Sequence, residues 1–528
     1  MLYLFSLMPV VLAILLYIIP YVRVIKSMAL FCQLGLTASS VYIFFLSKSE
    51  EIVTNIGDYE SVLGITLRSD TLSSVFVALT SFLFLVVVIY GFNDNYGRFY
   101  WFFMFIWQGL LNGLFLSSDL FNMFVFIEVA TIIVSVLMMY KRDNRSMYDG
   151  MVYLMINTVA VQFYLFGIGY IYKLTGVLDI DAAMKIMKQM DPATFYLPFA
   201  LIMTAISLKC ALVPLFGWLP KAHGTASAPT AVSALLSGLH IKCAIYLFIR
   251  FQIFFEMIDL SVFFIAIGII TGFVGFIMAL SQSDIKLILA YHTISQIGII
   301  MLALNIPDAY SRTGGVYHII NHAMFKSALF LCAGIINEVY GTRDIYQIRG
   351  VLKRLPLVGG ATIMAILGIT GAPLFNGSIS KYFIVSGAGA FVSAMIILIN
   401  LGTIISFIKY STILFGGKKQ SINREEIDVF RQMAVLILGI ICFFGGIFGE
   451  QFIHFLFNID VGVDAAGYFE KILLFAISVA VGYVVFRYYV KKSLILKKIG
   501  SFSQNFRGMC ASLGVFFVLV LIALRVLL

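Results

Sequence analysis

Three side chains that can hold a proton recur on one predicted helix. His318, His322 and Lys326 lie within "HIINHAMFK", inside an otherwise apolar segment that runs from 315 to 336. Because they are spaced four residues apart, all three face the same side of a helix. An apolar helix tolerates such a row if the groups line a hydrated path for protons, and we interpret the row in this way.

Four further ionisable side chains lie deep in apolar segments: Glu128, Lys209, Lys242 and Lys381. A charge at the centre of a membrane span is unfavourable by about 2.5–3.5 kcal/mol on insertion scales, so such groups are expected to be paired, hydrated or functional. A lysine in a low-dielectric interior releases its proton more readily, a nearby glutamate opposes that release, and histidine passes protons between such sites. The predicted proton relay consists of these four groups and His322.

Structural roles remain open for several of these residues. Glu128 could serve as the partner of a lysine on a neighbouring helix, and His318 could be a packed core histidine. His240 faces another side of its helix than Lys242, and either a packing or a relay role fits it. Lys409 lies near the end of a span, where a long side chain reaches the membrane interface.

The composition identifies a multi-pass membrane protein. Hydrophobic residues make up 61% of the chain and charged residues 12%, far from the balance of a soluble domain. The first 20 residues lack a basic start and a cleavage site, so we expect a retained helix rather than a signal peptide. No phosphate-binding loop, haem or iron–sulfur motif is present, and the six cysteines are scattered. We therefore expect no cofactor, no metal and no nucleic-acid partner.

The apolar runs predict an all-α protein with about 16 transmembrane helices. These runs cover 2–20, 28–47, 72–92, 99–117, 120–140, 149–172, 195–219, 230–250, 260–281, 285–305, 315–337, 356–388, 394–415, 432–457, 468–490 and 508–528. The runs 195–219 and 356–388 contain Pro and Gly near the middle, which predicts broken helices of the kind that line ion sites. Most Lys and Arg residues fall on one face by alternation. That face is predicted to be cytoplasmic, with both termini outside.

Two parts of the chain resemble each other. The offsets between the matching segments are about 159–165 residues, as expected of an internal repeat. The matching pairs are "SSDLFNMFVFIE" with "SQSDIKLILAYH", "YLMINTVAVQF" with "YHIINHAMFKS", and "VPLFGW" with "APLFNG". Each unit has an odd number of predicted helices, so the second is expected to be inverted relative to the first. The predicted divisions are 1–98, a first repeat 99–255, an inverted repeat 256–416, and C-terminal helices 417–528.

The same motifs carry a family resemblance. The segments "KCALVPLFGWLPKAHGTASAPTAVSALLSGLHIK", "SDIKLILAYHTISQIG", "NHAMFKSALFL" and "APLFNGSISKYF" resemble the antiporter-like subunits shared by respiratory complex I, Mrp-type sodium/proton antiporters and membrane-bound hydrogenases. The resemblance runs from about residue 95 to 415. It implies a fourteen-helix core of two inverted five-helix repeats, with helices 7 and 12 broken.

The resemblance also implies roles for single residues. Glu128 and Lys209 correspond to a coupled ion pair, Lys242 and His322 to the connecting relay, and Lys381 to the exit-side lysine. The secondary candidates in the same motifs are His318, Lys326, His292, Lys221 and His223.

The chain departs from the family pattern in two places. Gln296 follows Ser295 where the family often has histidine, which puts a relay step there in doubt. The two last spans lie beyond the usual core. The most distal complex I subunit has a long amphipathic helix parallel to the membrane. No such helix is evident here, which favours a central, D-type or hydrogenase-type member.

The leading functional hypothesis is a proton-translocating subunit of a multisubunit redox-driven or Mrp-type complex in the cell (inner) membrane. Its expected partners are other membrane subunits, including homologous antiporter-like ones, and lipid; the transported ions are protons, with Na⁺ as a further candidate. Two alternatives are a stand-alone secondary antiporter or solute carrier, and a structural or quinone-site subunit without transport. Nothing in the sequence resembles a set of ligands for a redox centre.

Overall fold

The chain folds into a bundle of apolar helices, in agreement with the predicted fold class. The computed structural model describes residues 1–59, 64–225, 227–417 and 427–528. Within these ranges, 14 helices are long and apolar enough to cross a membrane. Two of the other predicted spans correspond to the shorter apolar helices Leu4–Ile18 and Pro356–Thr370. The predicted set of about 16 hydrophobic segments is thus recovered as helices.

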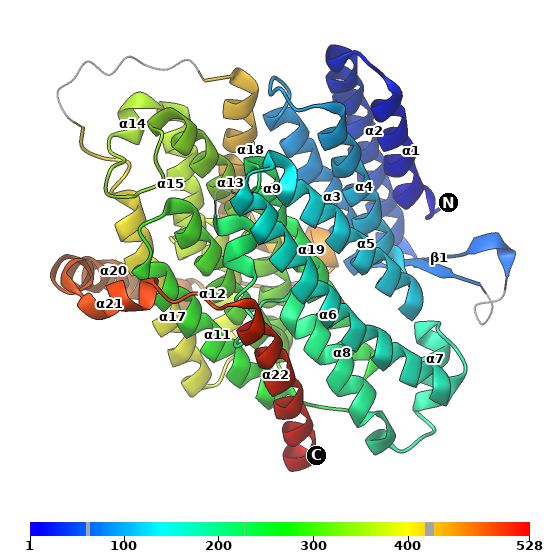
Figure 1. The fold of residues 1–528 in the computed structure, drawn as a ribbon. Coiled ribbons are helices and arrows are strands. Elements are labelled where there is room, and N and C mark those ends of the chain that lie inside the picture. The colour runs from blue at the N-terminus through cyan, green and yellow to red at the C-terminus, as the bar shows by residue number, and fades with distance from the viewer. Residues whose placement is uncertain (60–63, 226, 418–426) are drawn as a thin grey trace.

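The N-terminal part forms three helices and a hairpin. The two strands pair antiparallel and project from the side of the bundle in Figure 1. The Asp70 side chain accepts a hydrogen bond from the backbone N–H of Ser73 and so caps the third helix. The elements are α1 (Leu4–Ile18), α2 (Val22–Ser49), β1 (Ile52–Asn55), β2 (Thr66–Ser69) and α3 (Thr71–Tyr90).

The next two groups of helices contain the candidate site. The first comprises α4 (Arg98–Leu116), α5 (Leu120–Met138), α6 (Asn144–Thr175), α7 (Ile180–Met187), α8 (Tyr196–Lys209), α9 (Thr230–Leu235) and α10 (Ile241–Phe254). The second comprises α11 (Ser261–Ser281), α12 (Ile285–Asn305), α13 (Ala309–Tyr340), α14 (Val351–Arg354), α15 (Pro356–Thr370), α16 (Asn376–Ser386) and α17 (Ala390–Ser411). π-Helical turns occupy Pro220–Gly224 and Leu236–His240, and the second of them joins α9 to α10.

The C-terminal part comprises α18 (Val429–Ile447), α19 (Gly449–Phe457), α20 (Ala465–Tyr488), α21 (Leu494–Gly500) and α22 (Phe506–Leu527). Helix α20 packs on α17, α21 on α11, and α22 on α6 and α8. The segment after α21 therefore runs across the bundle from the second group of helices to the first (Figure 1). Short 3₁₀ turns lie at Ile56–Asp58, Met139–Lys141, Pro192–Phe195 and Val490–Lys492.

The two central groups of helices carry the same helix-capping residues at corresponding positions. Asp119 caps α5 and Asp284 caps α12, while Asp143 caps α6 and Asp308 caps α13. Each pair of aspartates is 165 positions apart in the sequence. Helices α6 and α13 both span 32 residues and end at a glycine in the left-handed conformation. These matches support the predicted repeat; its inversion and the boundaries 99–255 and 256–416 stay predictions.

The centre of the bundle is formed by α12 and α13. In the most apolar stretch of each helix, 94% of the residues are buried. Helices α20 and α22 lie at the periphery, where 17% and 22% of the residues in their most apolar stretches are buried. Glycines let α12 approach α11 closely, because a Cβ added at Gly298 would lie 2.4 Å from the Gly272 nitrogen. The charged row on α13 therefore sits in the most enclosed part of the protein.

Candidate functional site

The first predicted break lies directly after Lys209. Helix α8 ends there, Ala211 takes the left-handed conformation, and α9 begins only at Thr230. The helix end leaves carbonyl groups without partners in the helix, and the Trp218 indole N–H donates to the Leu208 carbonyl at 2.8 Å. The break therefore keeps its backbone satisfied and presents the Lys209 side chain at a helix end.

Lys209, at the end of α8, contacts α5 close to Glu128, but the two residues do not form an ion pair in the described structure. The Lys209 amine donates to Thr131 Oγ1 at 3.0 Å, and Thr131 lies about one turn after Glu128. One carboxylate oxygen of Glu128 accepts from the Thr158 hydroxyl at 3.2 Å. The other, Oε2, is buried and has no hydrogen-bonding partner in the described part of the chain. The two members of the implied coupled pair therefore contact different threonines, and no hydrogen bond joins them in the described structure.

His240 is fixed in one protonation state by its neighbours. The Trp107 indole N–H, which can only donate, lies 3.3 Å from His240 Nδ1. Nδ1 is therefore the unprotonated acceptor, and the ring proton of neutral His240 sits on Nε2. Nε2 lies 3.1 Å from the Tyr153 hydroxyl. Because both ring nitrogens are engaged, the contacts favour a packing role for His240 over the relay role that the sequence left open.

Lys242 and His322 meet at the centre of the bundle. Both side chains are fully buried, and Lys242 Nζ lies 2.5 Å from His322 Nδ1. The same amine donates to the Ser237 carbonyl at 2.5 Å. Ser237 belongs to the π-helical turn, a distortion that releases carbonyl groups from regular helix bonding. The predicted connection between these two residues is therefore a direct contact in the structure.

The row on α13 is buried as predicted, and its members have different partners. His318 Nδ1 lies 2.9 Å from the Ser380 hydroxyl, and its Nε2 lies 3.1 Å from Gln296 Oε1. The Lys326 amine donates to the Leu289 carbonyl at 2.5 Å. Gln296 thus takes part in the network as a hydrogen-bonding partner, although it cannot carry a proton as a histidine would. His318 connects the row to α16, whereas the Lys326 amine has only a backbone carbonyl as its hydrogen-bonding partner among the described residues.

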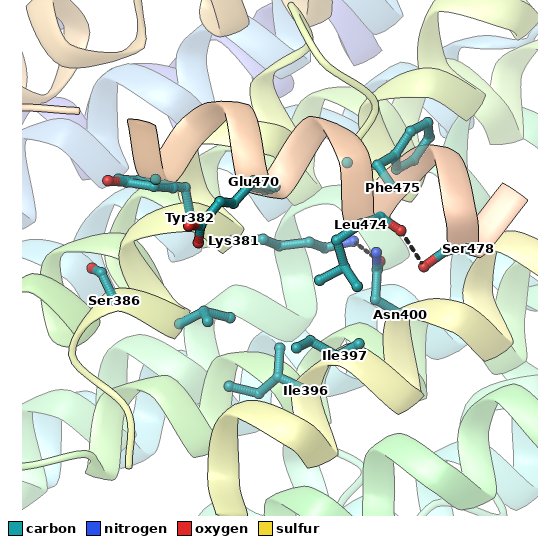
Figure 2. Close-up of a pocket in the computed structure, with 14 residues that line it drawn as sticks. Lys381, Tyr382, Ser386, Ile396, Ile397, Asn400, Glu470, Leu474, Phe475 and Ser478 are labelled. Atoms are coloured by element: carbon teal, nitrogen blue, oxygen red, sulfur yellow. Dashed lines mark hydrogen bonds between the residues drawn. The ribbon is translucent and has the colours of Figure 1, made fainter. Parts of the chain in front are cut away.

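The second predicted break separates α15 from α16 and presents Lys381. Gly371 and Leu374 take left-handed conformations between the two helices. The Lys381 amine donates to the Ile369 carbonyl at 2.6 Å, near the end of α15, and to Asn400 Oδ1 at 2.7 Å. Figure 2 shows the Lys381 side chain extending to Asn400. As at the first break, a lysine stands where a helix has been interrupted.

The remaining secondary candidates lie apart from these contacts. His292 packs on Phe407 with ring centres 4.8 Å apart, and His223 packs on Phe330 at 5.1 Å. Both ring nitrogens of His292 and of His223 are buried without hydrogen-bonding partners among the described residues. Lys221 lies over the ring of Tyr148. The structure therefore brings the five primary candidates into contact networks and leaves these three outside them.

Several hydroxyl and amide groups of the site were not anticipated from the sequence. They are Thr131, Thr158, Ser237, Thr293, Ser380 and Asn400. A usable signal existed for some: Thr131 lies three residues after Glu128, and Ser380 directly precedes Lys381. A hydroxyl both donates and accepts a hydrogen bond, so such groups can connect ionisable side chains that do not touch.

The arrangement supplies amine, imidazole and carboxylate groups from one helix break to the other. The order in space is Glu128 and Lys209 at the first break, Lys242 with His322 at the centre, and His318 with Ser380 beside Lys381 at the second break. Each ionisable member can hold and release a proton. Among the residues that the structure describes, no three His, Cys, Asp or Glu side chains gather so as to hold a metal ion.

Comparison with known proteins assigns this fold and sequence pattern to a family. The D-type component of the Na⁺/H⁺ antiporter of Alkalihalophilus pseudofirmus is 29% identical over 75% of this chain and 82% of its own length. The N-type component of the NADH-quinone oxidoreductase of Desulforudis audaxviator is 31% identical over 74% of this chain and 83% of its own length.

Two solved structures share the fold. A chain of the Mrp complex from Dietzia sp. DQ12-45-1b superposes with a TM-score of 0.80 and 23% identity, over 92% of this chain and 98% of that chain. A chain of the membrane-bound sulfane sulfur reductase, an archaeal respiratory complex, superposes with a TM-score of 0.80 and 22% identity, over 91% and 98%. Residues 117–408 match the membrane family described as NADH:quinone oxidoreductase/Mrp antiporter, and the chain belongs to this family.

Proposed function

We propose that this chain is the proton-translocating, antiporter-like subunit of a multisubunit membrane complex. The observation that carries the proposal is the buried contact between Lys242 and His322, which joins the two halves of the site at its centre. The names of the relatives, components of an Na⁺/H⁺ antiporter and of a quinone oxidoreductase, support the same function. The two related structures come from multisubunit complexes, which supports membrane-protein partners. We propose that homologous antiporter-like subunits are among them.

The contacts suggest how protons move. A proton on the Lys242 ammonium can pass to His322 Nδ1 along the existing hydrogen bond, leaving a neutral amine and a charged imidazole. A rotation of the His322 ring or a bridging water would bring the proton towards His318, one helical turn away. From there, the Ser380 hydroxyl offers a route to the neighbourhood of Lys381. We propose Glu128 and Lys209 as the pair whose charge state starts this sequence, with both chain termini on the outer side of a cell (inner) membrane.

Purification of the native complex tests this function. We expect a tag on this chain to retain further membrane subunits, and the reconstituted complex to move protons in liposomes that contain a pH-sensitive dye. Efficient transport by the chain alone would favour a stand-alone antiporter. A complete complex that moves no protons under its own driving reaction or an imposed Na⁺ gradient would contradict the proposal.

Replacement of Lys381 is expected to depend on the substituent. Lys381→Glu should retain more transport than Lys381→Ala, because a carboxyl group can still hold and release a proton at this position, whereas alanine cannot. The measurement is the initial rate of proton transport per assembled complex, with the exposed Lys353→Ala as matched control. Equal losses in both variants would show that a cation is required at this position.

A further inference from the structure

A cavity lies between α16, α17 and α20, beside the second break. Its volume is about 520 Å³, and it is lined by Lys381, Asn400, Ile396, Glu470 and Lys471, among others (Figure 2). Helix α20 lies outside residues 117–408, the part of the chain that matches the family. The cavity therefore combines a candidate relay lysine with a second lysine from a peripheral helix.

The Lys471 amine is held by groups that can stabilise a cation. It donates to the Ser378 carbonyl in the first turn of α16. It also lies 5.6 Å from the ring centre of Tyr382 and 6.0 Å from that of Tyr468. A carbonyl oxygen and two aromatic faces all stabilise a cation. Among the described residues no carboxylate forms an ion pair with this amine, so its charge stays uncompensated at contact distance.

Tyrosines fix the same end of α20 to the break. The Tyr468 hydroxyl lies 3.1 Å from Ser378 Oγ and accepts from the Leu374 N–H at 3.4 Å. The Tyr382 hydroxyl accepts from the Asp464 N–H at 3.2 Å. The position of Lys471 beside the cavity is therefore defined by several contacts and does not depend on its own hydrogen bond alone.

The other titratable groups around Lys381 leave this charge in place. His318 on α13 is engaged by Ser380 and Gln296. Glu450 on α19 accepts from the Val463 N–H at 2.5 Å. Glu470 on α20 lines the cavity but is exposed, and an exposed carboxylate is screened more strongly than a charge inside the protein.

We propose that Lys471 is a positioning residue for proton release, a fixed positive charge that opposes a second positive charge on Lys381. Two like charges that share a low-dielectric cavity repel each other strongly. The proton then leaves the Lys381 ammonium for water at the open side of the cavity, and Lys381 remains as a neutral amine. This inference rests on the proposed function, and it gives the peripheral helix α20 a part in transport.

A charge series at position 471 tests the inference in the assembled complex. We expect Lys471→Arg to transport at nearly the wild-type rate, Lys471→Met about tenfold more slowly, and Lys471→Glu more slowly still, in the order of the charge at this site. Tyr468→Phe is the matched control, because it removes the hydroxyl anchors of α20 and keeps the ring and the charge. In the double variant Lys471→Met/Leu474→Lys, a lysine one turn further along the cavity should restore part of the rate.

The outcomes separate charge from anchoring. If Tyr468→Phe is as slow as Lys471→Met and neither Lys471→Arg nor the double variant recovers, Lys471 only attaches α20 and the inference is wrong. It is also wrong if Lys471→Met transports like wild type while Lys209→Ala does not. Loss of the proposed function is recognised separately, since the wild-type complex itself would then fail to move protons.

Discussion

Lys209→Ala is expected to abolish proton transport while the complex still assembles. Lys209 is the last residue of α8, and alanine preserves the helix up to the break. The substitution removes the amine that Thr131 holds near Glu128. A relay that loses a proton-holding group loses general acid–base assistance on the order of 10²–10⁴-fold. The measurement is proton uptake by reconstituted complex, with assembly checked on native gels.

Glu128 provides the complementary test of the same pair. Glu128→Gln keeps an oxygen for the Thr158 hydroxyl but removes the negative charge, whereas Glu128→Ala removes both. If the charge is what matters, both variants should be inactive. Lys173→Ala, an exposed lysine on α6, is the control for nonspecific effects. Normal transport by assembled Glu128→Ala would remove the pair from the mechanism.

The helices and the two breaks were predictable because each leaves a local signal. Apolar runs of spanning length define the helices, and Pro with Gly marks the interruptions near 214 and 373. The identity of the buried ionisable residues was equally visible, since a charge in an apolar run is rare.

The partners of these residues were not predictable from local pattern. Lys209 contacts Thr131, which is 78 positions away, and His318 contacts Ser380, which is 62 positions away. Helical periodicity states which face a residue occupies on its own helix, but not which residue of another helix lies opposite. The resemblance implied a coupled ion pair of Glu128 and Lys209, whereas in the described structure the two residues contact different threonines and not each other.

Lys471 shows the same limit at the level of a whole helix. Residues 468–490 were predicted to be one more apolar span, and they do form a helix. Hydropathy does not reveal that its first turns pack beside the second break, because that depends on the shape of the groove formed by α16 and α17. A lysine near the start of a peripheral span also fits a snorkelling role, so its contact with the Ser378 carbonyl became evident only in three dimensions.

His322→Ala is expected to have the largest effect among the three residues of the α13 row. His322 holds the direct contact with Lys242, and without it the Lys242 amine retains only the Ser237 carbonyl, which cannot accept a proton for onward transfer. The next ionisable group, His318, lies one helical turn further, about 6 Å along the axis. That distance exceeds a hydrogen bond, so transport should fall by on the order of 10²-fold.

The two neighbours in the row should be less sensitive, and they provide the controls. His318→Ala interrupts the link to Ser380 and is expected to have the second-largest effect, while Lys326→Ala removes an amine that ends on the Leu289 carbonyl and should have the smallest. His322→Gln separates a relay role from a structural one, because the glutamine amide can accept from Lys242 but cannot carry a proton onward. If His322→Gln transports at the wild-type rate and His322→Ala does not, His322 serves only as the hydrogen-bond acceptor that holds Lys242 in place, and the proton reaches the second break by another path.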